Sequence, residues 1–170
     1  PRGHPGNLGA PFTAHADSAR TALVDLSRAE FPCEVSFRDL DALCNAVARG
    51  LRREGLRAGD RIGILSLNRM EFAATLLGAM RAGVVPVPIN IKLAADSTHH
   101  ILNDAGVKLV FCEAAFQKLA PPNQRVVTYS IDFDNFLDHG DFSPTEPAPD
   151  TVAIQPYTSG STGKPKGVLL

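Results

Sequence analysis

The sequence predicts an α/β fold in which a mostly parallel sheet is flanked by helices. Short apolar runs typical of strands alternate with segments of helical periodicity from about residue 22 onward. Most strand candidates are separated by whole helices, as parallel strands require, and not by tight turns. Hydrophobic residues make up 44% of the 170 residues and charged residues 21%, a composition that can fill a packed core.

The first elements follow from short local patterns. Residues 22–26 form an apolar strand candidate. Ser36 is expected to cap a helix, with Asp39 three residues later as its capping-box partner. Apolar residues then recur at helical spacing as far as Leu51, and Gly55 is expected to end this helix.

A second strand is expected at residues 61–67, where the run RIGILSL is apolar along most of its length. Asn68 follows directly and is expected to cap the next helix, with Glu71 at the reciprocal position. That helix carries apolar residues at helical spacing and is expected to end at Gly83.

A third strand, or an extended run, is expected at residues 84–89, and its two prolines suit the edge of a sheet or the end of a strand. Pro86 and Pro88 each lack the N–H group that a central strand would donate. The remaining elements are expected as a helix at 97–105, a short helix at 114–119, and strands at 107–112, 125–129 and 151–157. Three prolines and three acids in residues 141–150 predict an extended connector before the last strand.

The stretch YTSGSTGKPKG, residues 157–167, has the properties of a phosphate-binding loop. Its glycines allow backbone conformations in which successive N–H groups point into one concavity. Its hydroxyl side chains can donate to phosphate oxygens, and Lys164 and Lys166 supply positive charge that no acid between Thr151 and Leu170 neutralises. A flexible linker of this composition is the alternative, but linkers seldom lie between two apolar runs such as TVAIQPY and GVLL.

Two common nucleotide-binding motifs do not occur in the sequence. A Walker loop ends in Gly-Lys followed by Ser or Thr, whereas Gly163-Lys164 is followed by Pro165. The dinucleotide fingerprint G-x-G-x-x-G is absent as well. These absences argue against a P-loop kinase and against a nicotinamide dehydrogenase.

The stretch at 157–167 resembles the phosphate-binding signature of the adenylate-forming enzymes. This family includes acyl- and aryl-CoA ligases, peptide-synthetase adenylation domains and firefly-type luciferases. Residues 59–90 resemble the family's early strand–helix–strand segment, and Asn90 at its end is more typical of the acyl-CoA ligases. The resemblance covers about residues 10–170 and implies the N-terminal subdomain of an adenylate-forming ligase.

The resemblance implies a two-step reaction in which the substrates are a fatty or aryl carboxylic acid, ATP with its Mg²⁺, and CoA. The carboxylate attacks the α-phosphate of ATP, and the acyl-adenylate then passes its acyl group to the thiol of CoA. By the same resemblance, Lys166 is the main countercharge for the phosphates, Lys164 has a lesser role, and Gly167 closes the motif. The β- and γ-phosphates are expected to contact Thr158, Ser159, Gly160, Ser161, Thr162 and Gly163. We expect no catalytic residue and no metal ligand within the chain.

The resemblance also divides the chain. Residues 1–143 correspond to the N-terminal α/β subdomain of the AMP-binding domain, and residues 144–170 to a proline-rich connector, a strand and the phosphate-binding loop. The family's other functional parts follow this loop, so we expect a truncated N-terminal part that is inactive alone. The alternatives are an amino-acid-adenylating domain of a peptide synthetase, a non-enzymatic interaction module, and an unrelated α/β nucleotide-binding protein.

Composition limits the partners and the compartment. The net charge of −1 and the lack of a basic excess argue against nucleic acid as a partner. No apolar run approaches the ~18 residues of a membrane span, and no signal-peptide pattern occurs, so a cytoplasmic location is expected. Cys33, Cys44 and Cys112 lack metal-ligand spacing and are expected to be reduced core thiols. A homo-oligomer is compatible with the sequence.

Overall fold

Four parallel strands form the central sheet of the protein. The computed structural model describes residues 6–27, 30–158 and 164–170. Within them the strands lie in the order β4-β3-β5-β6. Their bounds are Arg61–Leu65 for β3, Val85–Pro88 for β4, Val107–Cys112 for β5 and Val126–Thr128 for β6. Each neighbouring pair is parallel, and the proline-containing β4 lies at the edge, so both predictions are confirmed.

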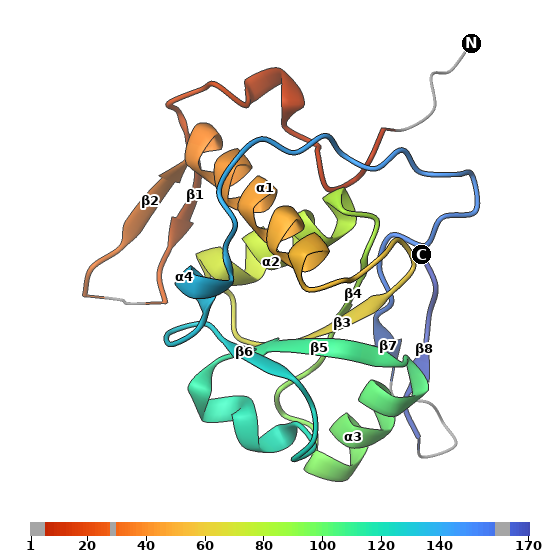
Figure 1. Ribbon diagram of the computed structural model, residues 1–170. Helices are drawn as coiled ribbons and strands as arrows, with labels where there is room; N and C mark the ends of the chain where they lie inside the picture. Colours follow the sequence, from red (N-terminus) through yellow and green to blue (C-terminus); the bar gives the residue numbers. More distant parts are fainter. Residues whose placement is uncertain (1–5, 28–29, 159–163) are drawn as a thin grey trace.

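Helices cover both faces of this sheet (Figure 1). The helices α1 (Phe37–Arg53) and α2 (Met70–Arg81) lie on one face, and α3 (Ala95–Asp104) lies on the other. The larger apolar cluster is packed between α1, α2 and the sheet and includes Phe111. The second cluster lies between α3 and the sheet and includes Val110, because successive residues of a strand point to opposite faces.

Shorter elements complete the chain. The described residues include two 3₁₀ helices, η1 (Thr13–His15) and η2 (Ala114–Leu119), and the short α-helix α4 (Phe133–Phe136). The first strand, β1 (Thr21–Asp25), pairs in an antiparallel hairpin with β2 (Cys33–Ser36), which the sequence analysis did not predict. No described helix is both long enough and apolar enough to cross a lipid bilayer.

The start of α1 follows the local sequence pattern. Ser36 is the N-cap, and its Oγ accepts a hydrogen bond from the backbone N–H of Asp39 at 3.1 Å. The helix ends at the expected place, where Gly55 adopts a φ of +83° that favours glycine. On the inner face of α1, Val47 approaches α2 so closely that a Cβ atom at Gly78 would lie 2.7 Å from the Val47 Cβ. The cap at Ser36, the helical periodicity and Gly55 together predicted α1 and its buried face.

The start of α2 differs from the prediction. Arg69, and not Asn68, is the N-cap residue, and its side chain makes no capping hydrogen bond. Instead, the backbone N–H of Met70 donates to Asp25 Oδ2 at 2.9 Å. The expectation for Asn68 was wrong because the capping oxygen comes from β1, which lies far away in sequence.

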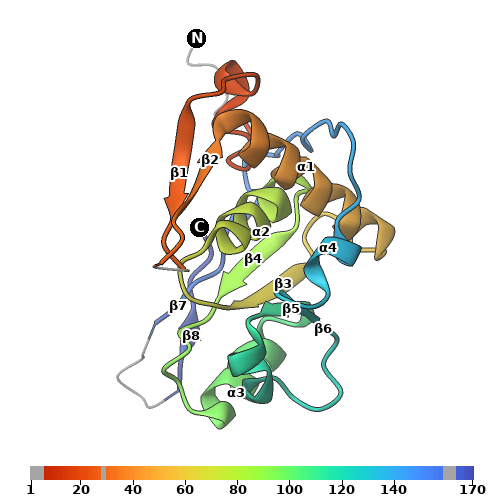
Figure 2. The ribbon, with the colours of Figure 1, turned by 90° about the vertical axis from the view of Figure 1, so that its left-hand side faces the viewer.

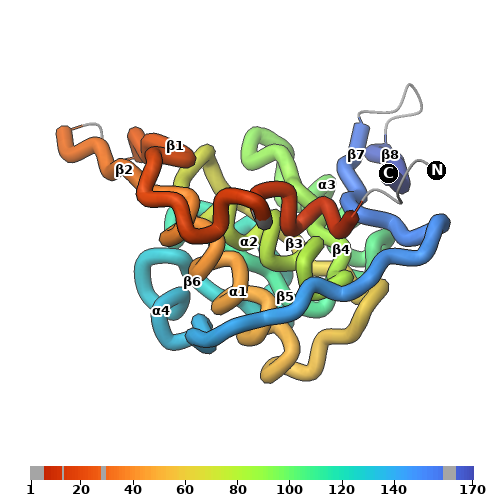
Figure 3. The backbone as a smooth tube through the Cα atoms, turned by 90° about the horizontal axis from the view of Figure 1, so that it is seen from above, coloured from red at the N-terminus to blue at the C-terminus, as the bar shows by residue number. Residues whose placement is uncertain are grey.

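The connector after α4 packs against the helical layer (Figure 3). Arg49 Nε on α1 donates to the carbonyl oxygen of Asp138 at 3.1 Å. Thr145 accepts a hydrogen bond from Arg52 at 3.1 Å through its hydroxyl and donates its backbone N–H to Arg81 at 2.9 Å. The extended connector was expected, and these contacts fix its path across α1 and α2 toward the sheet edge.

The cysteines differ in their accessibility to solvent. Cys44 and Cys112 are buried, as expected, but Cys33 on β2 is exposed, so that part of the prediction was wrong. Burial raises the pKa of the Cys44 thiol to about 12 and that of Cys112 to about 11. Both buried thiols therefore lack the thiolate form that reacts with disulfide reagents near pH 8.

We expect a disulfide reagent at pH 8 to modify one thiol of the folded protein rapidly, at Cys33. Cys44 and Cys112 are expected to react after denaturant is added, because unfolding exposes them and restores an ordinary thiol pKa. Released chromophore measured with time checks this, and a Cys33→Ser variant is the control. Rapid reaction of that folded variant would contradict the predicted burial.

Candidate functional site

An antiparallel hairpin at the edge of the sheet carries the predicted phosphate-binding residues that the structure describes. Its strands are β7 (Tyr157–Thr158) and β8 (Lys166–Gly167). Tyr157 lies opposite Gly167, and Thr158 lies opposite Lys166. The hairpin follows a segment attached to the edge strand β4, where the backbone N–H of Gln155 donates to the carbonyl oxygen of Pro86 at 3.0 Å. Figures 1 and 2 show the hairpin beside the sheet, on the side of β4.

The structure brings together part of the predicted set. Thr158, Lys166 and Gly167 are neighbours across the hairpin, and Lys164 is on the arm that leads into β8. The other predicted phosphate contacts lie outside the described residues: Ser159, Gly160, Ser161, Thr162 and Gly163. The geometry of the site is thus that of the two arms on either side of these residues.

The charge of the hairpin is suited to an anion. Lys164 and Lys166 are both exposed, and within the described ranges neither forms an ion pair with a carboxylate. Thr158 is exposed as well, so its hydroxyl is available as a donor. Two unneutralised ammonium groups on the arm opposite Thr158 form a positive local field, which favours a phosphate group.

The hairpin contacts helix α3 through both of its arms. The Tyr157 hydroxyl donates to Asp104 Oδ2 at 2.6 Å, and His100 Nε2 lies 3.3 Å from the carbonyl oxygen of Pro165. Neither contact was predicted from the sequence. Asp104 and Tyr157 are 53 residues apart, so no local sequence pattern connects them.

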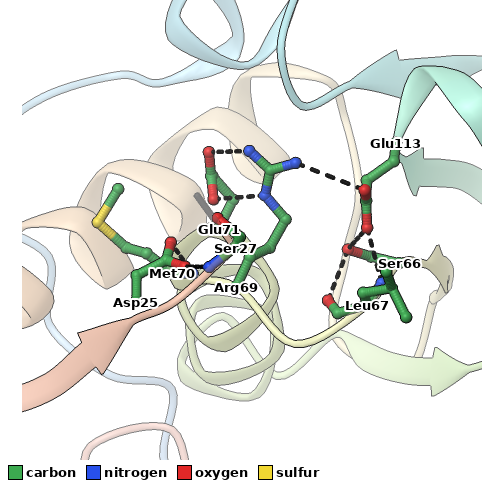
Figure 4. Close-up of polar contacts among 8 residues, drawn as sticks. All are labelled: Asp25, Ser27, Ser66, Leu67, Arg69, Met70, Glu71 and Glu113. Carbon is green, nitrogen blue, oxygen red and sulfur yellow. Dashed lines mark hydrogen bonds and ion pairs between the residues drawn. The ribbon is translucent and has the colours of Figure 1, made fainter. Parts of the chain in front are cut away.

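A second polar cluster lies where β3 and β5 end (Figure 4). The Arg69 guanidinium donates to both carboxylate oxygens of Glu71 at 2.7 Å and lies 3.8 Å from Glu113 Oε2. Glu113, after β5, accepts hydrogen bonds from the Ser66 hydroxyl at 2.9 Å and from the Leu67 N–H at 2.7 Å, both after β3. Ligands often bind at the carboxyl ends of the strands in open α/β sheets. This cluster is therefore a second candidate for the functional site, besides the hairpin.

The cluster is a closed ionic network. The hydrogen bonds that Arg69 donates to the Glu71 carboxylate hold the pKa of Arg69 above its ordinary value. Burial alone would raise the pKa of Asp25, but the donors of Met70 and Ser27 outweigh it and lower that pKa. Each charged group therefore already has partners of opposite polarity. This arrangement stabilises the ends of β3 and β5 and offers no free acid or base for catalysis.

A cavity of about 630 Å³ lies away from the hairpin and from this polar cluster. It is bounded by the beginnings of β3 and β4, by the N-terminal segment near Leu8, and by the connector from Thr145 to Ala153. Most of the lining is aliphatic or proline, and its charged groups include a cation, Arg61, and two acids, Glu146 and Asp150. Because charges of both signs line the cavity, its chemistry does not indicate a particular ligand.

A solved structure of a ligase shares this architecture. A long-chain-fatty-acid-CoA ligase from Archaeoglobus fulgidus superposes with a TM-score of 0.82 at 26% sequence identity, covering 96% of this chain and 36% of that chain. The fold is therefore that of the N-terminal part of adenylate-forming ligases, a parallel sheet with flanking helices.

The sequence comparisons identify the family. The model of the AMP-binding enzymes matches residues 12–170, so the chain belongs to the AMP-binding enzyme family. The chain is 36% identical over 145 residues to a fatty acid–acyl-carrier-protein ligase of Streptomyces coeruleorubidus, covering 80% of this chain and 28% of the relative. It is 33% identical over 152 residues to a 3-hydroxybenzoate–CoA/4-hydroxybenzoate–CoA ligase of Thauera aromatica, covering 79% of this chain and 29% of the relative. The resemblance to adenylate-forming enzymes is confirmed, and the chain spans less than a third of the length of these two relatives.

Proposed function

We propose that the protein activates a fatty or aryl carboxylic acid as its acyl-adenylate and transfers the acyl group to a thiol. In the first step a carboxylate oxygen forms a bond to the α-phosphorus of ATP, and the bond from that phosphorus to the bridging oxygen of the β-phosphate breaks. In the second step the thiol attacks the acyl carbon, and AMP leaves. Family membership supports this reaction class, and the two proposed acid classes correspond to those named for the relatives.

The observation that carries the proposal is the pairing of Thr158 with Lys166 across the hairpin. Negative charge accumulates on pyrophosphate as it leaves, and donors that are already in position stabilise it without reorganisation. We assign the contacts with the β- and γ-phosphates to Thr158 and to residues 159–163. Lys166 is the main countercharge, and Lys164 has a lesser role. Gly167 has no side chain, which leaves room for the neighbouring Tyr157. Mg²⁺ bound to ATP would neutralise part of the phosphate charge.

The acceptor thiol and the acid class are the finer parts of this proposal. CoA is the acceptor that we favour, and an acyl carrier protein is the second candidate, because a relative at 36% identity is named for that acceptor. The structure does not show Asn90, the residue more typical of the acyl-CoA ligases, in a role that would select the acid. Its side-chain oxygen accepts the backbone N–H of Lys92 at 2.9 Å in a turn, which an aspartate would do as well.

We also propose the division between residues 1–143 and 144–170. The first part contains the parallel sheet and its helices, and the second contains the later connector and the hairpin. By resemblance, the family's sites for ribose, the acid and the thiol follow the phosphate-binding loop in sequence. We therefore expect the 170 residues alone not to catalyse adenylation.

The test is carboxylate-dependent exchange of labelled pyrophosphate into ATP, measured with a panel of fatty, aryl and amino acids. The protein encoded by the open reading frame that contains this chain should exchange label with at least one fatty or aryl acid. The 170-residue chain should not. Exchange supported by amino acids alone would contradict the acid class, and a folded protein inactive with every acid would contradict adenylation.

A further inference from the structure

Helix α3 contacts the two arms of the phosphate hairpin at separate points. The Tyr157 hydroxyl, on the arm before the loop, donates to Asp104 Oδ2 at 2.6 Å. On the arm after the loop, the carbonyl oxygen of Pro165 lies 3.3 Å from His100 Nε2. The two α3 residues are one helical turn apart and so lie on the same face of the helix. One rigid element thus holds the chain on both sides of residues 159–163.

The position of Asp104 is not explained by its own helix. It is the last residue of α3, and no basic residue lies in the last turn. The C-terminus of a helix carries partial negative charge, so a carboxylate there is unfavourable for the helix itself. The contact that this carboxylate makes is the hydrogen bond from Tyr157, on an element far away in sequence.

Tyr157 is also held from the side of the sheet. Its ring packs against the apolar cluster beneath α3. Its hydroxyl accepts a hydrogen bond from Gln155 Nε2 at 3.2 Å, and Gln155 Oε1 accepts one from Arg61 Nε on β3 at 3.4 Å. Burial, together with the hydrogen bond to Asp104, raises the pKa of Tyr157 well above its ordinary value. The hydroxyl therefore remains protonated, and a donor, throughout the neutral range.

Gly167 leaves the space that this arrangement needs. It is opposite Tyr157 in the hairpin. A Cβ atom at Gly167 would lie 2.7 Å from Gln155 Nε2 and 3.0 Å from Tyr157 Cζ. Any side chain here would therefore displace the groups that hold the Tyr157 hydroxyl.

We propose that Asp104 is a positioning residue, which fixes the phosphate hairpin by holding the Tyr157 hydroxyl, with His100 as a second contact on the other arm. The assignment of the hairpin to nucleotide phosphates rests on the proposed function, whereas the mechanical coupling does not. Because Thr158 directly follows Tyr157 and pairs with Lys166, restraint of Tyr157 limits the motion of both phosphate-binding residues. Ordering before ATP arrives lowers the conformational entropy lost on binding.

The coupling is tested by backbone hydrogen exchange of the hairpin without ATP. The variants are Asp104→Ala, Tyr157→Phe and the double variant. Asp96→Asn is the matched control, because Asp96 is an exposed acid in the first turn of the same helix.

We expect each single variant to speed exchange at residues 157–158 and 166–168 by about fivefold, as loss of one hydrogen bond predicts. The double variant should match a single one, and the control should match the wild type. An unchanged rate in Asp104→Ala, or multiplied effects in the double variant, would overturn the proposal.

The catalytic consequence is tested separately by pyrophosphate exchange. Asp104→Ala should raise the KM for ATP about fivefold and leave the KM for the acid unchanged. Asp104→Asn, which keeps an acceptor oxygen, should restore the KM for ATP to within about twofold of wild type. If the substitution only reduced the fraction of folded protein, it would lower the apparent kcat and leave both KM values unchanged. That result would also overturn the proposal. If the wild-type protein shows no exchange with any acid, the proposed function fails, and hydrogen exchange alone decides the coupling.

Discussion

Replacement of Asp41 by alanine is expected to lower the free energy of unfolding by about 3 kcal/mol, because it leaves a buried guanidinium without its counterion. Arg81 on α2 is 3% exposed, and its Nη2 donates to Asp41 Oδ1 on α1 at 2.9 Å. Its other acceptors are neutral: the Asn45 side-chain oxygen at 2.6 Å, the Gly9 carbonyl at 3.0 Å and the Asp41 carbonyl at 3.1 Å. These groups cannot replace the carboxylate charge.

Urea unfolding followed by circular dichroism measures this loss. The matched control is Asp138→Ala, which removes the ion pair between Asp138 and Arg49. Both side chains of that pair are about one-third exposed, so we expect a loss below about 1 kcal/mol. Equal losses in the two variants would contradict the role assigned to the buried pair. Replacing Arg81 and Asp41 together by Met and Leu should recover much of the loss, because no buried charge is then left unpaired.

Replacement of Lys166 by alanine is expected to reduce pyrophosphate exchange about 100-fold, comparable with the loss of one preorganised donor at a site of developing charge. Lys166 is in β8, where pairing with Thr158 fixes its backbone. Lys164 precedes Pro165 and lies outside both strands of the hairpin. We therefore expect Lys164→Ala to stay within about fivefold of wild type, since a less restrained side chain loses more entropy on binding.

The rates should be measured at saturating acid, with ATP varied. Lys118→Ala, which removes an exposed lysine on η2, controls for the change in net charge and should exchange label at the wild-type rate. Wild-type exchange in Lys166→Ala combined with inactivity of Lys164→Ala would show that the roles of the two lysines are reversed.

Elements with a strong internal pattern could be predicted from the sequence. Ser36 caps the N–H of Asp39, three residues away, and the apolar residues of α1 follow in the same segment. Local patterns were therefore sufficient to predict this helix. The parallel sheet followed from the alternation of strands and helices, and the edge position of β4 followed from Pro86 and Pro88. In each case the information was contained in one continuous segment.

Features that depend on distant residues could not be predicted in this way. The cap of α2 comes from Asp25 on β1, so the local rule assigned it wrongly to Asn68. The strand expected at residues 151–157 is reduced to Tyr157 and Thr158 in β7, although residues 153 and 154 exchange backbone hydrogen bonds with Leu170.

The candidate site shows the same limit. Its hydroxyls, glycines and lysines were recognisable because they are consecutive in the sequence. The contacts that hold the site in place could not be recognised, because Asp104 and Tyr157 meet only in the folded chain.

The most direct test of adenylation is the fate of the carboxylate oxygen. The acid that supports exchange is labelled with ¹⁸O in both carboxylate oxygens and turned over to completion with ATP and the acceptor thiol, and the AMP is analysed by mass spectrometry. Attack of the carboxylate on the α-phosphorus predicts one ¹⁸O atom in each AMP formed. Label in inorganic phosphate together with release of ADP, or AMP without label, would contradict the formation of an acyl-adenylate.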